Sequence, residues 1–311
     1  MRLIFAGTPE PAVVALSRLL ESEHEVVAVL TRPDARRGRG RTLHPSPVSE
    51  LAQQHGIEVL TPATIKPNTP DGDAFRARLT ELAPDCVPVV AYGNLITEDL
   101  LQAVPHGWIN LHFSLLPRWR GAAPVQAAIA AGDTSTGATT FRIDKGLDTG
   151  QILGVTHEPI QSTDTADDLL TRLAYSGADL LVNTMDNLAQ GIATYSEQIG
   201  TATYAPKITT EDARIQWTHP AEAVDKHIRA VTPGPGAWSL LGDQRFKIGP
   251  VSVAEESDLQ PGHMRIEKNR VLVGTGDLNI ELDQIQPQGK KRMKASDWAR
   301  GLQNTEGLVL S

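Results

Sequence analysis

The sequence predicts an α/β protein in which a doubly wound, mainly parallel sheet is followed by a small β-barrel. Over the first two thirds of the 311 residues, apolar β-branched runs alternate with amphipathic helical patterns, as is typical of a doubly wound sheet. The last third has short strand-like runs around one helix, separated by turns rich in Gly and Pro, which favours a barrel. The length also suits two domains of about 150 residues each.

The elements of the first domain follow from local patterns. Residues 3–6 are predicted as a strand, with Thr8 as the N-cap and Pro9 as the first residue of a helix. After a strand at 26–30 and an Arg-rich loop, Ser46 caps the next helix. The remaining predicted strands are 57–60, 87–92, 108–114, 138–143 and 151–155, and the remaining predicted helices are 74–82, 124–131 and 165–188.

The patterns predict two domains joined by a linker. The first domain covers 1–189, and 190–207 has little periodicity and is predicted as the linker. The second domain, 208–311, is the predicted barrel. Its helix is expected at 220–231 and its strands at 237–241, 246–248, 271–273 and 278–282.

Composition and local patterns exclude several classes of protein. The first apolar run is too short for a signal peptide, and no later run approaches the roughly 20 apolar residues that cross a bilayer. We therefore expect a cytoplasmic protein without membrane contact. The one cysteine, Cys86, allows no internal disulfide, and the nine histidines have no metal-ligand spacing, so we expect no metal.

Two basic clusters stand out in a chain whose formal charge is −8. The first is an Arg-rich segment at 31–42, and the second lies near the C-terminus. Basic clusters on an acidic protein suit local contact with phosphate groups, and the alternative is a pair of solvated loops. The cluster members are Arg32, Arg36, Arg37, Arg39 and Arg41 in the first and Lys290, Lys291, Arg292 and Lys294 in the second.

The segment 108–117 carries the strongest chemical signal. Side chains alternate along a strand, so Asn110, His112 and Ser114 are expected on one face. An amide and an imidazole are suited to stabilise the negative charge that develops on a carbonyl oxygen under nucleophilic attack. An isolated Asn-x-His motif is more often structural than catalytic, so its context decides its role.

A turn rich in Asp and Gly, DKGLDTG at 144–150, follows the predicted strand 138–143. Turn chemistry alone accounts for such a composition. Ligands in open α/β sheets nevertheless bind beyond the carboxyl ends of the strands. Asp148 is therefore a candidate to bring a carboxylate to the sheet end that carries His112.

Several familiar motifs are absent from the sequence. It has no GxGxxG after the first strand, no Walker A motif and no GxSxG, which disfavours dinucleotide binding, nucleotide triphosphate binding and a serine nucleophile. The polar residues suit polarising a carbonyl group better than attacking one.

Eight segments, spread over nearly the whole chain, match a known family. They are FAGTPE at 5–10, PSPV at 45–48, VVAYG at 89–93, INLHFSLLPRWRGAAPVQ at 109–126, GLDTGQIL at 146–153, ARIQW at 213–217, IRA at 228–230 and PQGKKRM at 287–293. Asn-x-His-x-Ser-Leu-Leu-Pro with a downstream Asp-Thr-Gly marks the wider formyltransferase superfamily. RWRGAAP and the C-terminal segments narrow the resemblance to one branch, and the chain resembles the methionyl-tRNA formyltransferases.

The resemblance implies a Rossmann-like formyltransferase domain followed by an OB-like barrel that binds tRNA. The implied reaction is direct transfer of a formyl group from the co-substrate 10-formyltetrahydrofolate to the α-amine of methionine on initiator Met-tRNA. Asn110 and His112 match residues that stabilise the oxyanion, and Asp148 matches the carboxylate that orients His112 and assists proton removal.

The resemblance also implies binding residues. Ser114, Leu115, Leu116 and Pro117 match the folate-binding segment, and Arg39 matches an arginine that reaches into the tRNA acceptor end. The other residues expected to bind tRNA are Arg36, Arg37, Arg41, Lys290, Lys291 and Arg292. We expect the protein to act as a monomer.

Alternatives within and beyond the superfamily remain. A glycinamide ribonucleotide or sugar-amine formyltransferase and a formyltetrahydrofolate hydrolase share the chemistry, and a non-catalytic RNA-binding relative shares the scaffold. The barrel and the basic loop disfavour the enzymes that formylate small amines. The presence of Asn110, His112 and Asp148 together disfavours a protein that only binds RNA. Three residues depart from the family pattern: Pro11 beside the expected folate pocket, Pro88 within a strand and Phe113 behind the polar face.

Overall fold

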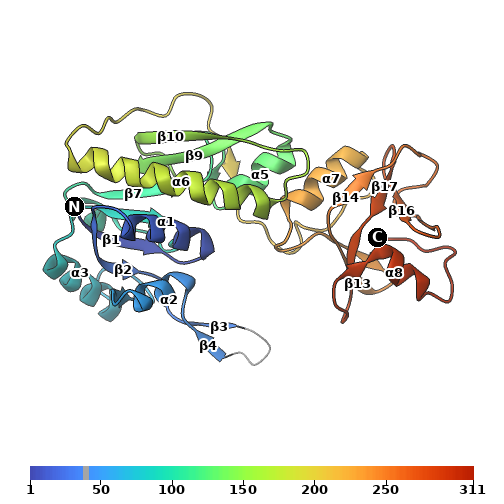
Figure 1. Ribbon diagram of the computed structural model, residues 1–311, viewed down its shortest axis with the longest axis horizontal. Coiled ribbons are helices and arrows are strands. Elements are labelled where there is room, and N and C mark those ends of the chain that lie inside the picture. The colour runs from blue at the N-terminus through green and yellow to red at the C-terminus, as the bar shows by residue number, and fades with distance from the viewer. Residues whose placement is uncertain (38–41) are drawn as a thin grey trace. The chain divides into compact units, whose positions relative to one another are not determined.

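The computed structural model of the protein describes residues 1–37 and 42–311 (Figure 1). It divides into two compact units, each made of segments that are separate in sequence. The first unit comprises Met1–Gly121, Ser135–Pro159 and Leu170–Tyr204, and the second comprises Ala122–Thr134, Ile160–Leu169 and Ala205–Ser311.

The first unit is built on a seven-stranded sheet of order β10-β9-β7-β6-β1-β2-β5. The five strands from β7 to β5 pair in parallel, whereas β9 pairs antiparallel with both of its neighbours, β7 and the edge strand β10. This confirms the predicted doubly wound, mainly parallel sheet. Its strands are β1 (Arg2–Gly7), β2 (Glu25–Leu30), β5 (Glu58–Leu60), β6 (Val87–Val90), β7 (Trp108–His112), β9 (Ser135–Arg142) and β10 (Ile152–Pro159).

Helices cover the sheet and begin where local caps allow. Ser46 accepts a hydrogen bond from the Ser49 N–H and caps its helix as predicted. Thr8 does not cap the first helix, because its hydroxyl donates to the Tyr92 carbonyl instead. The helices are α1 (Glu10–Leu20), α2 (Pro47–Gln54), α3 (Pro70–Leu82), α4 (Glu98–Gln102) and α6 (Ala166–Ala189).

One core cluster of the first unit joins α3 to a face of the sheet. Phe75 and Leu79 of α3 are buried in a cluster with Ile4 of β1 and Trp108 of β7. The indole N–H of Trp108 donates to the Leu100 carbonyl at 2.7 Å, so the polar atom of this buried ring is satisfied.

Pro88 is the second residue of β6, an interior strand. Proline cannot donate to a ladder, so it is expected at a strand start, at an edge or at a bulge. Here it lies one residue after the start of β6, which is not an edge strand. The pairing of β6 with β1 passes over Pro88, since the paired residues are Leu3 with Cys86 and Ala6 with Val89. The Val87 N–H donates to the Gly107 carbonyl on the β7 side, so the nitrogen of Pro88 faces β1, and the pairing with β1 has its gap there.

The second unit combines short strands with helices around a separate core. Two four-stranded sheets, β12-β13-β18-β19 and β14-β17-β16-β15, enclose a buried cluster that includes Trp217, Trp238 and Phe246. The strands are β12 (Trp238–Leu241), β13 (Gln244–Ile248), β14 (Val251–Val253), β15 (Met264–Ile266), β16 (Val271–Gly274), β17 (Asn279–Leu282), β18 (Gln284–Pro287) and β19 (Met293–Lys294). The helices are α5 (Pro124–Ala131), α7 (Ala221–Ala230) and α8 (Ala295–Arg300).

Two further strand pairs complete the structure. The predicted Arg-rich loop contains a hairpin of β3 (Ala35–Arg37) and β4 (Thr42–His44). β8 (Arg120–Gly121) pairs with β11 (Tyr204–Ala205). The first strand lies where no element was predicted, and the second lies in the predicted linker. In the described part of the chain, no helix is long and apolar enough to span a membrane.

Candidate active site

Asn110 and His112 lie at the carboxyl end of β7, which is where a doubly wound sheet places ligands. They are two residues apart on the strand, so their side chains share a face, as predicted. His112 is buried, with 6 % of its surface exposed, and Asn110 is half-buried. Ser114 was expected on the same face, but β7 ends at His112 and the alternation ends with it.

The imidazole of His112 is oriented by a backbone carbonyl. Its Nε2 lies 2.9 Å from the Trp119 oxygen, and because a carbonyl only accepts, Nε2 carries a proton. In the neutral ring Nδ1 is then an unprotonated acceptor. Nδ1 lies 3.9 Å from Oδ2 of Asp148, which is close enough for charge interaction but too far for a hydrogen bond.

Burial and Asp148 act on His112 in opposite directions. Burial lowers the pKa of His112 below its ordinary value of 6.5, and the negative charge of Asp148 offsets only part of that effect. His112 is therefore neutral at neutral pH, with a proton acceptor facing a carboxylate. Once protonated at Nδ1, the ring would be stabilised by that carboxylate.

Asp148 sits in a turn that the surrounding backbone holds in place. Its φ is +51°, a left-handed conformation that Asp and Asn tolerate better than most residues. Its Oδ2 accepts a hydrogen bond of 2.7 Å from the Gly121 N–H. A side chain at Gly150 would collide with the Arg142 carbonyl, so the turn requires glycine there.

The segment that supplies the Trp119 carbonyl is itself held by residues from the predicted linker. The Trp119 N–H donates to Oγ1 of Thr203 at 2.9 Å, and the Arg120 N–H donates to the Thr203 carbonyl at 2.8 Å. The side-chain amide of Gln198 donates to the carbonyls of Asp148 and Gly150 at 2.8 and 2.9 Å.

These supporting residues were missed at the sequence level. Gln198 and Thr203 lie in a polar stretch with no periodicity, and nothing in their spacing points to β7. Trp119 lies in the RWRGAAP match, which marked this segment as part of the family pattern. The match gave no indication that the backbone carbonyl of Trp119 orients His112. The predicted linker thus contributes directly to the geometry of the site.

The predicted folate segment, 114–117, is held by Thr139 of β9. Its hydroxyl donates to the Ser114 carbonyl at 2.7 Å and accepts from the Leu116 N–H at 3.3 Å. The Ser114 hydroxyl donates to the Arg118 carbonyl at 2.6 Å, and Ser114 is fully buried. The hydroxyl of Ser114 therefore stabilises the turn, while Leu115 is half-buried and the Leu116-Pro117 peptide is cis.

The arrangement suits proton transfer next to a polarised carbonyl group. Nδ1 of neutral His112 accepts a proton, Asp148 stabilises the cation that results, and the amide of Asn110 supplies a donor on the same strand face. Among the described residues, no group of three or more His, Cys, Asp or Glu side chains is placed to hold a metal ion.

The predicted RNA-binding residues are exposed where the structure describes them. Arg36 lies on β3, and its side chain is exposed; Arg37 follows it on the strand, and Arg39 and Arg41 lie outside the described residues. In the second unit, exposed Lys290, Lys291 and Arg292 lie between β18 and β19.

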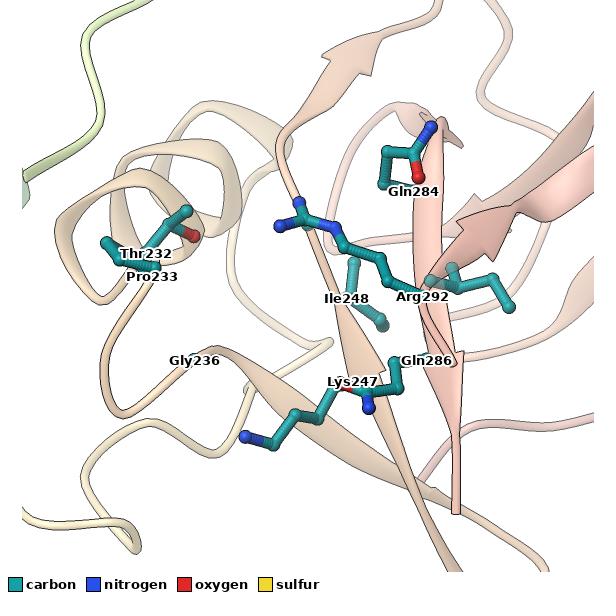
Figure 2. A pocket seen from close by; sticks show the side chains of 10 residues that line it. Thr232, Pro233, Gly236, Lys247, Ile248, Gln284, Gln286 and Arg292 are labelled. Carbon is teal, nitrogen blue, oxygen red and sulfur yellow. The ribbon is translucent and has the colours of Figure 1, made fainter. Parts of the chain in front are cut away.

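Arg292 also lines a hollow in the second unit (Figure 2). The hollow measures about 390 Å³ with the solvent at its mouth, and its other polar side chains include Lys247, Gln284 and Gln286. The ammonium of Lys247 donates to the Pro235 carbonyl at 3.1 Å, and in Figure 2 Lys247 and Arg292 both extend toward the segment 232–236. Two cations beside amide groups suit a phosphate group.

Comparison with known proteins gives matches over both units. The family model for formyl transferase matches residues 1–185, and the model for the formyl transferase C-terminal domain matches residues 207–303. The chain is 99 % identical to a methionyl-tRNA formyltransferase of Corynebacterium diphtheriae, over 311 residues that cover 100 % of both proteins.

Solved structures share the fold at low sequence identity. A crystal structure of a sugar 3N-formyl transferase in the presence of dTDP and 5-N-formyl-THF has a TM-score of 0.68 and 19 % identity, and the match covers 94 % of this chain and 99 % of that one. A methionyl-tRNA formyltransferase from Clostridium thermocellum has a TM-score of 0.55 and 15 % identity, with 91 % and 98 % covered.

Proposed function

The chain belongs to the formyl transferase family, and we propose that it transfers the formyl group of 10-formyltetrahydrofolate to the α-amine of methionine on initiator Met-tRNA. The observation that carries the chemistry is the buried His112, whose acceptor Nδ1 faces Asp148 on the strand that bears Asn110. The choice of substrate rests on the relative that matches the whole chain and is named for Met-tRNA.

In the proposed reaction the neutral amine attacks the formyl carbon directly. A carbon–nitrogen bond forms while the carbonyl π electrons move to oxygen, and Asn110 donates to that oxyanion. Neutral His112 accepts the proton that the amine loses, and Asp148 stabilises the resulting imidazolium. Collapse of the intermediate breaks the bond to N10 of the folate, which takes up a proton and leaves as tetrahydrofolate.

The role of His112 follows from its tautomer. The neutral ring has no donor at Nδ1, because its one proton lies on Nε2 and is engaged by Trp119. His112 therefore acts first as a base, and only its protonated form donates at Nδ1 to the oxyanion or the leaving nitrogen. The resemblance implied that His112 stabilises the oxyanion. In the proposed sequence of steps, His112 first accepts a proton from the amine and stabilises the oxyanion only afterwards.

We assign the folate co-substrate to the edge formed by 114–117. The fixed turn and the half-buried Leu115 support this assignment, because a preorganised apolar edge binds a flat ring at low entropic cost. A structural neighbour was crystallised in the presence of 5-N-formyl-THF, which agrees with a folate ligand for this fold.

The tRNA would be bound through phosphate contacts by both basic clusters. Arg36 of the first unit and Lys290, Lys291 and Arg292 of the second are exposed, and Arg37, Arg39 and Arg41 belong to the same Arg-rich segment of the sequence. A-form RNA is read largely through its backbone and shape, which flexible cations suit. We place the reaction in the cytoplasm and expect a monomer, which sedimentation equilibrium tests.

A formyl-transfer assay tests the proposal. The purified protein is supplied with labelled 10-formyltetrahydrofolate and with one of three amines: Met-tRNA, free methionine or a sugar amine. We expect the label on Met-tRNA alone. Formylation of the sugar amine, or release of free formate without transfer, would replace the proposed function with that of another superfamily member.

A further inference from the structure

Arg32 is held in an unusual way at the carboxyl edge of the sheet. It lies two residues beyond the end of β2, and its Nη1 donates to the Ala63 carbonyl at 3.2 Å and to Oδ1 of Asn94. Ala63 follows β5 and Asn94 follows β6, so all three come after parallel strands that end at the same edge as β7. The guanidinium is thus fixed at the edge where ligands bind.

The acceptor on Asn94 is itself positioned by buried groups. The Asn94 amide donates to the Tyr92 hydroxyl at 3.1 Å, which orients its Oδ1 toward Arg32. Tyr92 is buried, with 2 % of its surface exposed, and its carbonyl accepts from the Thr8 hydroxyl at 3.0 Å. Arg32 is therefore anchored through Asn94 to the core of the first unit.

The anchoring leaves one edge of the guanidinium available. Both hydrogens of Nη1 are used, whereas Nε and Nη2 donate to no group among the described residues. The Nε–Nη2 edge is the one that binds two oxygens of a phosphate or carboxylate side by side. No carboxylate of a described residue lies within ion-pair distance of Arg32, in contrast to Arg78, which is paired with Glu58 at 2.7 Å.

We propose that the Nε–Nη2 edge of Arg32 binds a backbone phosphate near the 3′ end of the RNA substrate, an inference that rests on the proposed function. Arg32 lies three residues before β3, in the same basic segment as the exposed Arg36, so its positive charge continues that of the hairpin toward the edge of the sheet. A preorganised bidentate contact would fix the terminal nucleotides beside the site.

The continuity with the hairpin favours RNA over the other anion in the reaction, the carboxylate of the folate. Arg32 follows β2, which is separated from β7 by β1 and β6, whereas the proposed folate edge directly follows β7. The long acceptor strand of an RNA spans that separation with its own phosphates. The folate carboxylate is the competing ligand, and the experiment separates the two.

Equilibrium binding of uncharged initiator tRNA tests the inference without relying on catalysis. Arg32→Lys keeps the charge but loses the paired donors, and we expect about tenfold weaker binding of intact tRNA. A tRNA that lacks its 3′-terminal nucleotides should bind the variant and the parent protein equally. Arg32→Gln should also reduce the slope of log Kd against log salt by about 0.7 to 0.9, the value for one phosphate.

Controls keep the result specific. Arg18→Lys changes an exposed arginine that Glu21 and Asp179 already neutralise, and its RNA affinity should equal that of the parent. Asn94→Ala removes one anchor but no charge, so it should weaken binding by a smaller factor than Arg32→Gln. Thermal unfolding midpoints of all variants show whether each is folded.

Two outcomes would overturn the inference. One is unchanged affinity of Arg32→Lys and Arg32→Gln for intact tRNA. The other is a loss of affinity for 5-formyltetrahydrofolate in place of RNA, which would make the folate carboxylate the ligand. If the parent protein binds tRNA but formylates none, the proposed function fails, while the comparison of intact and shortened tRNA still decides whether Arg32 binds the RNA end.

Discussion

Nε2 of His112 lies 2.9 Å from the carbonyl oxygen of Trp119, and this contact determines which nitrogen of the imidazole carries a proton. It leaves Nδ1 as the acceptor on the side of Asp148. A histidine that would be read from sequence as a hydrogen-bond donor is therefore, in its neutral form, a base toward that carboxylate. The first two predictions follow from this assignment.

Replacing His112 should reduce turnover without reducing RNA binding. Loss of a general base and of the donor it becomes should lower kcat of His112→Ala by roughly 10² to 10⁴. The affinity for tRNA, measured by filter binding, should change little, because we assign RNA contacts to other residues. A kcat within a factor of three of the parent value would exclude His112 from the proton transfer.

The pH dependence should reveal a base with a lowered pKa. Protonation of the substrate amine lowers kcat/KM as pH falls, whichever form His112 takes. Burial lowers the pKa of His112 below 6.5, so a second, additional decline of kcat/KM should set in below pH 6.5, as the ring becomes protonated. Asp148 raises that pKa, so Asp148→Asn should move the acidic decline to still lower pH while reducing the maximum rate.

Asparagine is the suitable substitution because it tolerates the positive φ of residue 148. The substrate amine titrates equally in both enzymes, so the difference between their profiles isolates His112. A decline that moves to higher pH in Asp148→Asn would contradict the assignment.

Removing the Thr139 hydroxyl should disturb folate binding in particular. Thr139→Val leaves the buried Leu116 N–H without its acceptor, at a cost of about 1 to 3 kcal/mol in unfolding free energy. It also frees the 114–117 turn, so the KM for 10-formyltetrahydrofolate should rise.

Thr140→Val is the matched control for that experiment. It removes a hydroxyl from the next residue of β9, where the partner is the Thr184 hydroxyl at 2.8 Å, away from the turn. Steady-state kinetics with varied folate should show a raised KM for Thr139→Val only. Equal KM values for the folate in the two variants would show that Thr139 has no particular role in folate binding.

Arg39→Ala should weaken the use of tRNA and flatten its salt dependence. Each lost phosphate contact reduces the slope of log Kd against log salt by about 0.7 to 0.9. The expected result is a lower kcat/KM for Met-tRNA, with an unchanged KM for the folate. If the variant had the same kinetics as the parent enzyme at every salt concentration, the Arg-rich segment would be a solvated loop without a role in RNA binding.

Strong local patterns made much of the fold predictable. The prediction of α5 at 124–131 is confirmed at both ends, and Ser46 caps α2 as its position before a proline suggested. The Asn110 and His112 pair on β7 followed from simple alternation. These features depend on neighbours in sequence, so the sequence alone contained enough information.

The features that were missed depend on contacts between distant segments. Thr8 has the residue type of an N-cap, but the Tyr92 carbonyl, 84 residues away, takes its hydroxyl. The strands β14, β15, β18 and β19 are two to four residues long, too short for periodicity to separate them from turns. The carbonyl that orients His112 has no side-chain signature.

The contacts that Gln198 and Thr203 make with the Asp148 turn and the Trp119 segment set a limit on how this enzyme can be cut and recombined. A fragment that stops where α6 ends, at Ala189, would keep every strand of the large sheet and lose both ties. A chimaera with a different C-terminal domain should therefore be joined after Thr203, because the part of the chain that forms the site extends beyond α6.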